Sequence, residues 1–311
     1  RIETFTQDSG LPLSLKNFIG YYHLDPRSIY GKFSFSRLCA DAGVLDDFIE
    51  PAECILTKAF SKLVAVDSRR WIKFLTDILP RFSCELAASL SDFEKRMLQM
   101  FYITVFQEAA DWRSHTTQAN MQLLADSPIM MHELNELLLF NLERIDFIDQ
   151  PVPLGFDCPL DLHCTYTRDQ ILIAMDYMTP KNVREGVKWL PDKQVDVFFI
   201  TLNKADKDYS PTTMYNDYSI NESLFHWQSQ STTSDTASTG QRYINHRQRG
   251  SKVVLFVREF KQDSIGAAPY TCLGTAAYVK HTGSKPMNIT WHLDQPIPAK
   301  YLRKTNKLVV G

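Results

Sequence analysis

Apolar side chains in the first half of the chain recur at helical spacing. Ser91–Glu94 has the form of a capping box, and an apolar stripe over residues 97–106 follows it. Ser127 before Pro128 predicts another helix start, Asp67–Ser68 predicts a third, and Ser34 or Ser36 predicts the start of a short helix that ends at Gly43. A serine N-cap with glutamate three residues later, or with proline at the first helical position, is typical of a helix start. Residues 1–150 are therefore predicted to form an all-α bundle whose stripes pack together rather than bind a cofactor.

The period changes from helical to strand-like in the second half of the chain. Short β-branched and aromatic runs cover residues 195–202 and 253–257, and apolar and polar positions alternate over 271–279 and 287–293. Such runs, broken by turn residues, favour a small curved sheet. The predicted fold class is α+β: an N-terminal helical bundle, residues 1–150, followed by a barrel-like domain with flanking helices, residues 151–311.

Three further segments complete this organisation. Residues 149–162 contain three prolines and a glycine, which disfavour both an α-helix and a hydrogen-bonded β-strand and predict a linker. Thr167–Gln170 is a second capping box and predicts a short helix. Residues 229–240, SQSTTSDTASTG, are so polar that we expect a mobile loop.

Composition excludes several classes of protein. No apolar run approaches the roughly eighteen residues of a membrane span, and no secretory leader precedes the domains, so we expect a cytoplasmic protein. The six cysteines are scattered without zinc-site spacing, which predicts reduced thiols and no metal. The first residue is Arg, which suggests a piece of a longer chain.

Net charge differs between the halves. The whole chain carries −2, but residues 1–150 hold 15 Lys and Arg against 21 Asp and Glu, a balance of −6. Residues 151–311 hold 19 against 15, a balance of +4. Local patches matter more than totals for binding polyanions, so the second half permits DNA binding without demonstrating it.

Residues 212–231 combine flat rings with amides, hydroxyls and one central carboxylate. Rings beside a few hydrogen-bonding groups suit the recognition of a planar polar object such as a nucleobase. Asp217 is the candidate acceptor for the exocyclic amine of cytosine. The other candidates for this base pocket are the rings of Tyr215, Tyr218, Phe225 and Trp227 as stacking walls, with Gln228 and Gln230 reading an edge. The alternatives are that a given ring is core packing, and that Asp217 caps a turn.

Basic residues that could contact phosphates lie nearby in the sequence. Arg242, His246, Arg247 and Arg249 occur in a predicted loop, GQRYINHRQRG, with Tyr243 among them as a candidate wedge. Lys280 and Lys285 flank the predicted hairpin turn KHTGSK. Phosphate contacts position a protein on DNA and make its binding salt-dependent. The alternative is that these are ordinary solvated turns.

Motifs of stand-alone catalysis are missing. The chain contains no phosphate-binding loop of the form GxxxxGK[ST], no GxGxxG after a strand, no GxSxG elbow and no HExxH pair. We therefore expect no catalytic residue, metal or cofactor in this piece, and recognition rather than hydrolysis.

The second half resembles a known family. The segments SPTTMY (residues 210–215), FHWQSQS (225–231) and GSKPM (283–287), within residues 160–311, are similar to the uncharacterised domain that closes many bacterial superfamily-two helicases. The same domain closes the ATP-dependent, modification-dependent (type IV) restriction enzymes of the SauUSI kind. The resemblance implies a barrel similar to the SRA and PUA-like readers of modified bases.

The resemblance also implies a parent chain and partners. The parent would be an ATP-dependent hydrolase, with a helicase motor that uses ATP and Mg and with a nuclease domain, and residues 1–150 would connect motor and reader. The expected ligand is double-stranded DNA in which a 5-methyl or 5-hydroxymethyl cytosine is flipped into an aromatic pocket. The alternative is a protein-interaction module that docks on the helicase motor without reading modified bases.

Overall fold

The computed structural model describes residues 1–203 and 217–305 and divides into two compact units. The helical unit comprises Arg1–Asp149, Asp169–Thr179 and Ser264–Gly266. The C-terminal unit comprises Gln150–Arg168, Pro180–Asp263 and Ala267–Gly311. The predicted division into domains of residues 1–150 and 151–311 stays a prediction.

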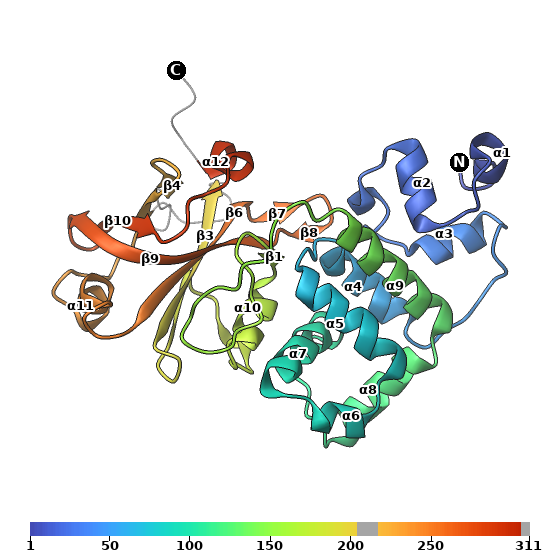
Figure 1. The fold of residues 1–311 in the computed structure, drawn as a ribbon, viewed down its shortest axis with the longest axis horizontal. Helices are drawn as coiled ribbons and strands as arrows, with labels where there is room; N and C mark the ends of the chain where they lie inside the picture. The colour runs from blue at the N-terminus through green and yellow to red at the C-terminus, as the bar shows by residue number, and fades with distance from the viewer. Residues whose placement is uncertain (204–216, 306–311) are drawn as a thin grey trace. The chain divides into compact units, whose positions relative to one another are not determined.

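Local sequence signals determine where several helices of the helical unit begin. The capping box at Ser91 is confirmed, with reciprocal bonds between Ser91 and Glu94, and Ser68 caps a helix as predicted. Of the two alternatives Ser34 and Ser36, Ser34 is the residue that caps a helix. The helices of this unit are α1 (Phe5–Ser9), α2 (Leu15–Tyr22), α3 (Phe35–Asp41), α4 (Glu53–Leu63), α5 (Arg69–Ile78), α6 (Cys84–Ser89), α7 (Asp92–Phe106), α8 (His115–Ala125) and α9 (Pro128–Glu143), with short 3-10 turns at Pro26–Ser28 and Leu79–Arg81. Figure 1 shows α4, α5, α7 and α9 side by side.

The start of α9 differs from the sequence prediction in its capping group. Ser127 accepts the backbone N–H of Ala52 and donates to the Leu123 carbonyl, so its hydroxyl does not cap its own helix. The carboxylate of Glu50 accepts the N–H groups of Ile129 and Met130 instead, at 2.8 and 2.9 Å. A side chain distant in sequence thus satisfies the orphan donors of this helix.

The C-terminal unit is built on one mixed sheet. Its strands run in the order β2-β3-β6-β9-β10-β5-β4, with β1 paired to β9, and β3 and β6 are parallel while the other pairs are antiparallel. The strands are β1 (Thr165–Tyr166), β2 (Val187–Leu190), β3 (Val195–Asn203), β4 (Tyr218–Ser219), β5 (Leu224–Gln228), β6 (Lys252–Phe260), β9 (Tyr270–Thr282) and β10 (Asn288–Leu293), while β7 (Gln262–Asp263) and β8 (Gly266–Ala267) pair separately. The α+β class is confirmed. Within the described ranges β2 and β4 end an open path, so the predicted barrel is not closed there.

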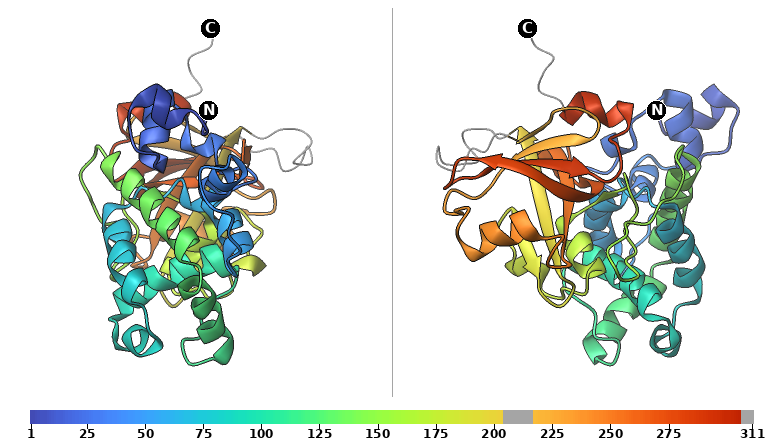
Figure 2. Two further views of the ribbon diagram at one scale, coloured as in Figure 1. Left: turned by 90° about the vertical axis from the view of Figure 1, so that its right-hand side faces the viewer. Right: turned by 60° about the vertical axis from the view of Figure 1, so that its left-hand side comes forward.

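One face of this sheet forms the core of the C-terminal unit. Phe225, Trp227, Ile289 and Trp291 alternate along β5 and β10 and are buried in one apolar cluster. The helix α11 (Ser238–Asn245) contributes Tyr243 to it, and Tyr301 and Leu302 of α12 (Ala299–Thr305) pack against it. Figures 1 and 2 show the two helices toward opposite ends of the sheet.

Residues 149–162 are more than the linker that their prolines predict. Val152, Leu154, Leu160 and Leu162 are buried, and the following residue, His163, donates its N–H to the Cys272 carbonyl of β9. The segment leads into α10 (Arg168–Ala174) and a 3-10 turn at Pro180–Asn182. Proline prevents a regular ladder, but it does not prevent apolar side chains from packing on a sheet.

The prediction of a mobile loop at residues 229–240 is wrong, because this segment is held by hydrogen bonds and leads into a helix. Ser229 is buried and accepts the N–H of Met287, and the carbonyl of Thr233 accepts the N–H of Lys285. From Ser238 the chain forms α11, and a Cβ at Gly240 would collide with the Ser234 carbonyl oxygen. Polar residues are ordered here because the β9–β10 hairpin supplies their hydrogen-bond partners, which composition cannot reveal.

His163 carries a pH dependence of stability. Burial, and then the charge of Lys300, lowers the pKa of His163 to about 4, and its Nε2 has no hydrogen-bond partner among the described residues. The unfolded chain protonates this histidine near pH 6.5, whereas the folded chain does so only near pH 4. The free energy of unfolding therefore decreases as pH falls from about 6.5 to about 4, by up to about 3 kcal/mol. Urea unfolding between pH 4 and 7 should show this slope, and the variant His163→Asn should flatten it. Asparagine suits the left-handed backbone at this position, where φ is 65°. An unchanged slope in the variant would contradict the assignment.

No helix in the described ranges, 1–203 and 217–305, has the length and apolar character needed to cross a membrane.

Candidate nucleic-acid interface

The structure separates the predicted base-pocket residues onto two sides of the sheet. Phe225 and Trp227 are on the core face, where the Trp227 ring lies 4.3 Å from that of Phe198. Both are packing residues in this conformation and do not wall an open pocket. Tyr215, with the motif SPTTMY, lies outside the described residues.

The remaining predicted pocket residues have polar surroundings. Asp217 is buried, and its Oδ1 accepts the backbone N–H of Gln228 at 2.8 Å. This hydrogen bond ties Asp217 to the last residue of β5. Tyr218 stacks on His226, with ring centroids 4.8 Å apart and planes 15° apart. Gln228 donates to Asn288 Oδ1 at 3.2 Å, and Gln230 accepts from the Thr233 hydroxyl.

Strand alternation places a set of polar side chains on the face opposite the core. Residues that pair directly in an antiparallel ladder share a face, and in this ladder Thr290 pairs with both His226 and Lys280. Tyr218 pairs with His226, and Asn288 pairs with both Gln228 and Thr282. We call this set the polar face: Tyr218, His226, Gln228, Lys280, Thr282, Asn288, Thr290 and His292. All eight are half-buried or exposed.

Three predicted phosphate contacts have structural roles instead. Arg242 and Tyr243 lie on α11, not in a loop, and Arg242 makes two bonds to the buried carboxylate of Asp196, at 2.7 and 2.8 Å. Tyr243 is fully buried in the core, so it does not form an exposed wedge. His246 is buried, burial lowers its pKa, and its Nε2 accepts the N–H of Tyr278. This ring is neutral near pH 7 and carries no charge to a phosphate.

The other predicted phosphate contacts are on the surface. Arg249, Lys280 and Lys285 are exposed, and the Arg247 side chain is 67% exposed. Arg247 and Arg249 follow α11, and Lys280 belongs to the polar face. These four cations are the members of the predicted set that can reach an incoming polyanion.

A polar cavity of about 320 Å³ adjoins Arg247. Asp294, one residue after β10, borders it and bonds to Arg247 at 3.1 Å and to the hydroxyl of Thr275 at 2.6 Å. The lining residues are Pro153, His246, Arg247, Gly250, Ser251, Lys252, Thr275, Ala276 and Asp294. Thr275, Lys252 and Asp294 are not among the site residues predicted from the sequence, where their only signal is a polar residue within or beside a predicted strand.

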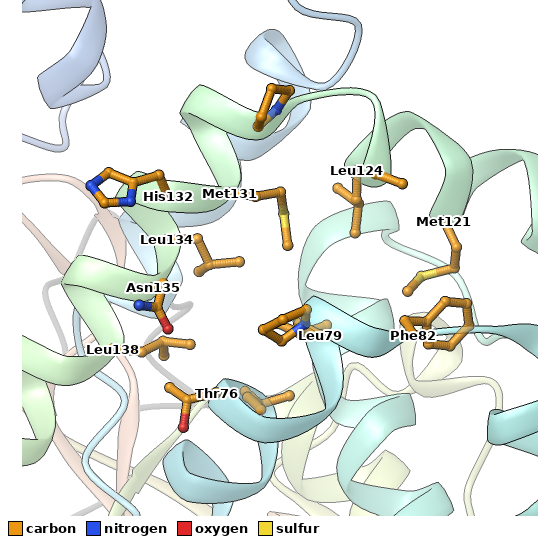
Figure 3. Close-up of a pocket in the computed structure, with 14 residues that line it drawn as sticks. Thr76, Leu79, Phe82, Met121, Leu124, Met131, His132, Leu134, Asn135 and Leu138 are labelled. Carbon is orange, nitrogen blue, oxygen red and sulfur yellow. The ribbon is translucent and has the colours of Figure 1, made fainter.

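A larger and more apolar pocket of about 440 Å³ lies in the helical unit. It is formed by α5, the 3-10 turn after it, α8 and α9. Figure 3 shows Leu79, Leu134 and Met131 around the hollow, with His132 pointing away from its centre. Its lining carries no carboxylate, lysine or arginine, which suits an apolar partner rather than a nucleic acid.

The described residues contain no group of three or more His, Cys, Asp and Glu that could hold a metal ion. Cys158, Cys164 and Cys272 are buried. Among curated proteins, no match to this chain is found. Residues 160–304, which include most of the sheet, the polar face and most of the cavity lining, match the family model described as "Domain of unknown function (DUF3427)".

Proposed function

We propose that the C-terminal unit is an SRA/PUA-like recognition domain that binds double-stranded DNA and reads a modified cytosine, 5-methyl or 5-hydroxymethyl. The observation that carries the proposal is the polar face. It combines stacked rings, amides, hydroxyls and a lysine on adjacent strands. The exposed Arg247 is joined to this region through Asp294 at the end of β10.

Each part of this surface suits one part of a DNA ligand. The cations can neutralise phosphates, which gives affinity without sequence preference. The amides and hydroxyls can hydrogen-bond base edges. Flipping a base costs a few kcal/mol, and stacking on a ring returns roughly 1–3 kcal/mol. The Tyr218–His226 pair is the ring surface that the polar face offers for stacking on a base.

The parent protein that we propose is a type IV restriction enzyme or a related helicase that acts in the cytoplasm. Its ATP-dependent motor and its nuclease would be supplied by other domains, and this piece would choose the DNA. The family match in residues 160–304 is consistent with a domain at the C-terminal end of helicases.

DNA binding can be tested by fluorescence anisotropy with unmodified, 5-methylated and 5-hydroxymethylated duplexes of one sequence. We expect tighter binding to one modified duplex. Arg249→Ala and Lys285→Ala should weaken binding to all duplexes alike, and each should lower the slope of log affinity against log salt by about one. Arg184→Ala, an exposed arginine just before β2 at the other end of the sheet, is the matched control.

Equal affinity for all duplexes at physiological salt would remove the modified-cytosine part of the proposal. Absence of binding even at low salt would remove DNA recognition altogether.

The second candidate function is a coupling module that docks on a helicase motor. The apolar pocket between α5, α8 and α9 favours it, because burial of an apolar partner there would remove leucine, methionine and phenylalanine side chains from water. If the chain binds none of the duplexes even at low salt, docking on a helicase motor becomes the better supported function.

A further inference from the structure

We propose that Asp294, in the polar cavity beside Arg247, is the carboxylate that reads the exocyclic amine of the target base. This inference rests on the proposed function and adds to it the position of the base and the residue that distinguishes it. It assigns the role to Asp294 and not to Asp217, the carboxylate predicted from the sequence.

The cavity is preformed by buried polar groups. His246, Ser251 and Thr275 line it and are each buried. The His246 ring is fixed on both sides, since its Nε2 accepts the Tyr278 N–H at 3.1 Å and its Nδ1 lies 3.2 Å from the Ser251 carbonyl oxygen. A cavity of about 320 Å³ with walls held in this way needs little rearrangement to admit a ligand.

Asp294 is held in place while part of it remains accessible. Its Oδ2 accepts the Thr275 hydroxyl at 2.6 Å, and its N–H donates to the Thr275 carbonyl at 2.9 Å. Its side chain is still 39% exposed. Asp217 differs, because it is buried and one of its oxygens already accepts a backbone N–H.

Arg247 is the partner that a nucleic acid would displace. It bonds to Asp294 Oδ1 at 3.1 Å, and its side chain is 67% exposed. An exposed ion pair of this kind contributes little, so a phosphate can take Arg247 at small cost. Departure of the guanidinium would leave Asp294 with its Thr275 bond and one oxygen directed to the ligand.

The groups around the cavity match the edge of an amino-pyrimidine. Asp294 can only accept hydrogen bonds while ionised, and Lys252, which also lines the cavity, can only donate them. Cytosine offers an amine donor beside ring acceptors, so the amine faces the Asp294 carboxylate and a ring acceptor faces Lys252. Thymine places a carbonyl oxygen where cytosine has its amine, and a phosphate would bring negative charge to Asp294. Both ligands are disfavoured there.

The test removes the amine from the base and the carboxylate from the protein in turn. Two duplexes carry 5-methylcytosine or 5-methyl-2-pyrimidinone, which lacks the amine, at one position, and affinities are measured by anisotropy. We expect the wild-type chain to bind the amine-free duplex roughly tenfold more weakly than the 5-methylcytosine duplex. For the Asp294→Ala variant, the two affinities should differ by less than about twofold. Easier unstacking of the altered base affects both proteins alike and cancels in the comparison.

Asp192→Ala is the matched control, since Asp192 is an exposed aspartate in the turn between β2 and β3. If Asp294→Ala fails to fold, Asp294→Asn keeps the size of the side chain and gives the same readout with a smaller change. An equal loss in wild type and Asp294 variant would overturn this inference alone, and DNA recognition would stand. A wild-type chain that binds no duplex would overturn both.

Discussion

Replacing Arg242 with alanine is expected to destabilise the C-terminal unit by about 3–5 kcal/mol, because it leaves a buried carboxylate without its counter-charge. The Asp196 side chain on β3 is fully buried, and Arg242 on α11 makes both of its side-chain bonds to it. Burial raises the pKa of Asp196, and the bonds from Arg242 oppose that rise. The guanidinium also lies 4.4 Å from the ring of Trp189. Urea unfolding followed by tryptophan fluorescence would measure the loss.

Two comparisons sharpen this prediction. Arg249→Ala removes an exposed arginine and should change stability by less than about 0.5 kcal/mol. Arg242→Met combined with Asp196→Leu replaces both charges by apolar groups and should recover most of the loss. If Arg242→Ala instead unfolds like the wild type and only weakens DNA binding, the side chain is a phosphate contact as the sequence first suggested.

Replacing Glu133 with alanine should destabilise the helical unit by about 2–5 kcal/mol, because one buried and one half-buried backbone donor lose their acceptor. Glu133 on α9 is 1% exposed, and its oxygens accept the N–H groups of Phe35 and Ser36 at 2.6 and 2.8 Å. Phe35 and Ser36 are the first residues of α3, so the carboxylate joins α9 to the start of α3. The bonded residues are 98 and 97 positions apart in sequence. Burial raises the pKa of Glu133, and the same hydrogen bonds oppose the rise.

Thermal unfolding followed by circular dichroism at 222 nm would measure the effect. The control is Glu143→Ala on the same helix. Glu143 is 55% exposed and pairs with Lys16 on the surface, so its loss should cost less than about 1 kcal/mol. Similar losses for the two variants would show that Glu133 does not hold the start of α3.

Helix starts were predictable where the capping group is local. Ser34, Ser68 and Ser91 cap the next turn with their own hydroxyls. Adjacent residues suffice to identify Ser68 and Ser91, while the local pattern left Ser34 and Ser36 as alternatives. The start of α9 was predictable from Pro128, but its capping carboxylate, Glu50, was not. The order in residues 229–240 was equally hidden, because Ser229 finds its partner at Met287, in a hairpin 58 residues away.

The candidate site divides in the same way. Periodicity in FHWQSQS requires Phe225 and Trp227 to share one face of a strand and His226 and Gln228 the other. Which face meets the core depends on the neighbouring strands and on α11, which are distant in sequence. The rings were therefore expected in a pocket, while the structure buries Phe225 and Trp227 and leaves Tyr218 and His226 on the polar face.

The sequence by itself determined the α+β class, the positions of the main helices and strands, and the presence of rings, amides and cations in the second half. These follow from interactions within a few residues, which local patterns encode. Only the tertiary structure decided that Arg242 pairs with a buried carboxylate, that His246 is buried, that Arg247 is exposed, and that Asp294 borders a cavity. The physical reason is that burial and ion pairing depend on which distant segments meet, and no local pattern specifies that meeting.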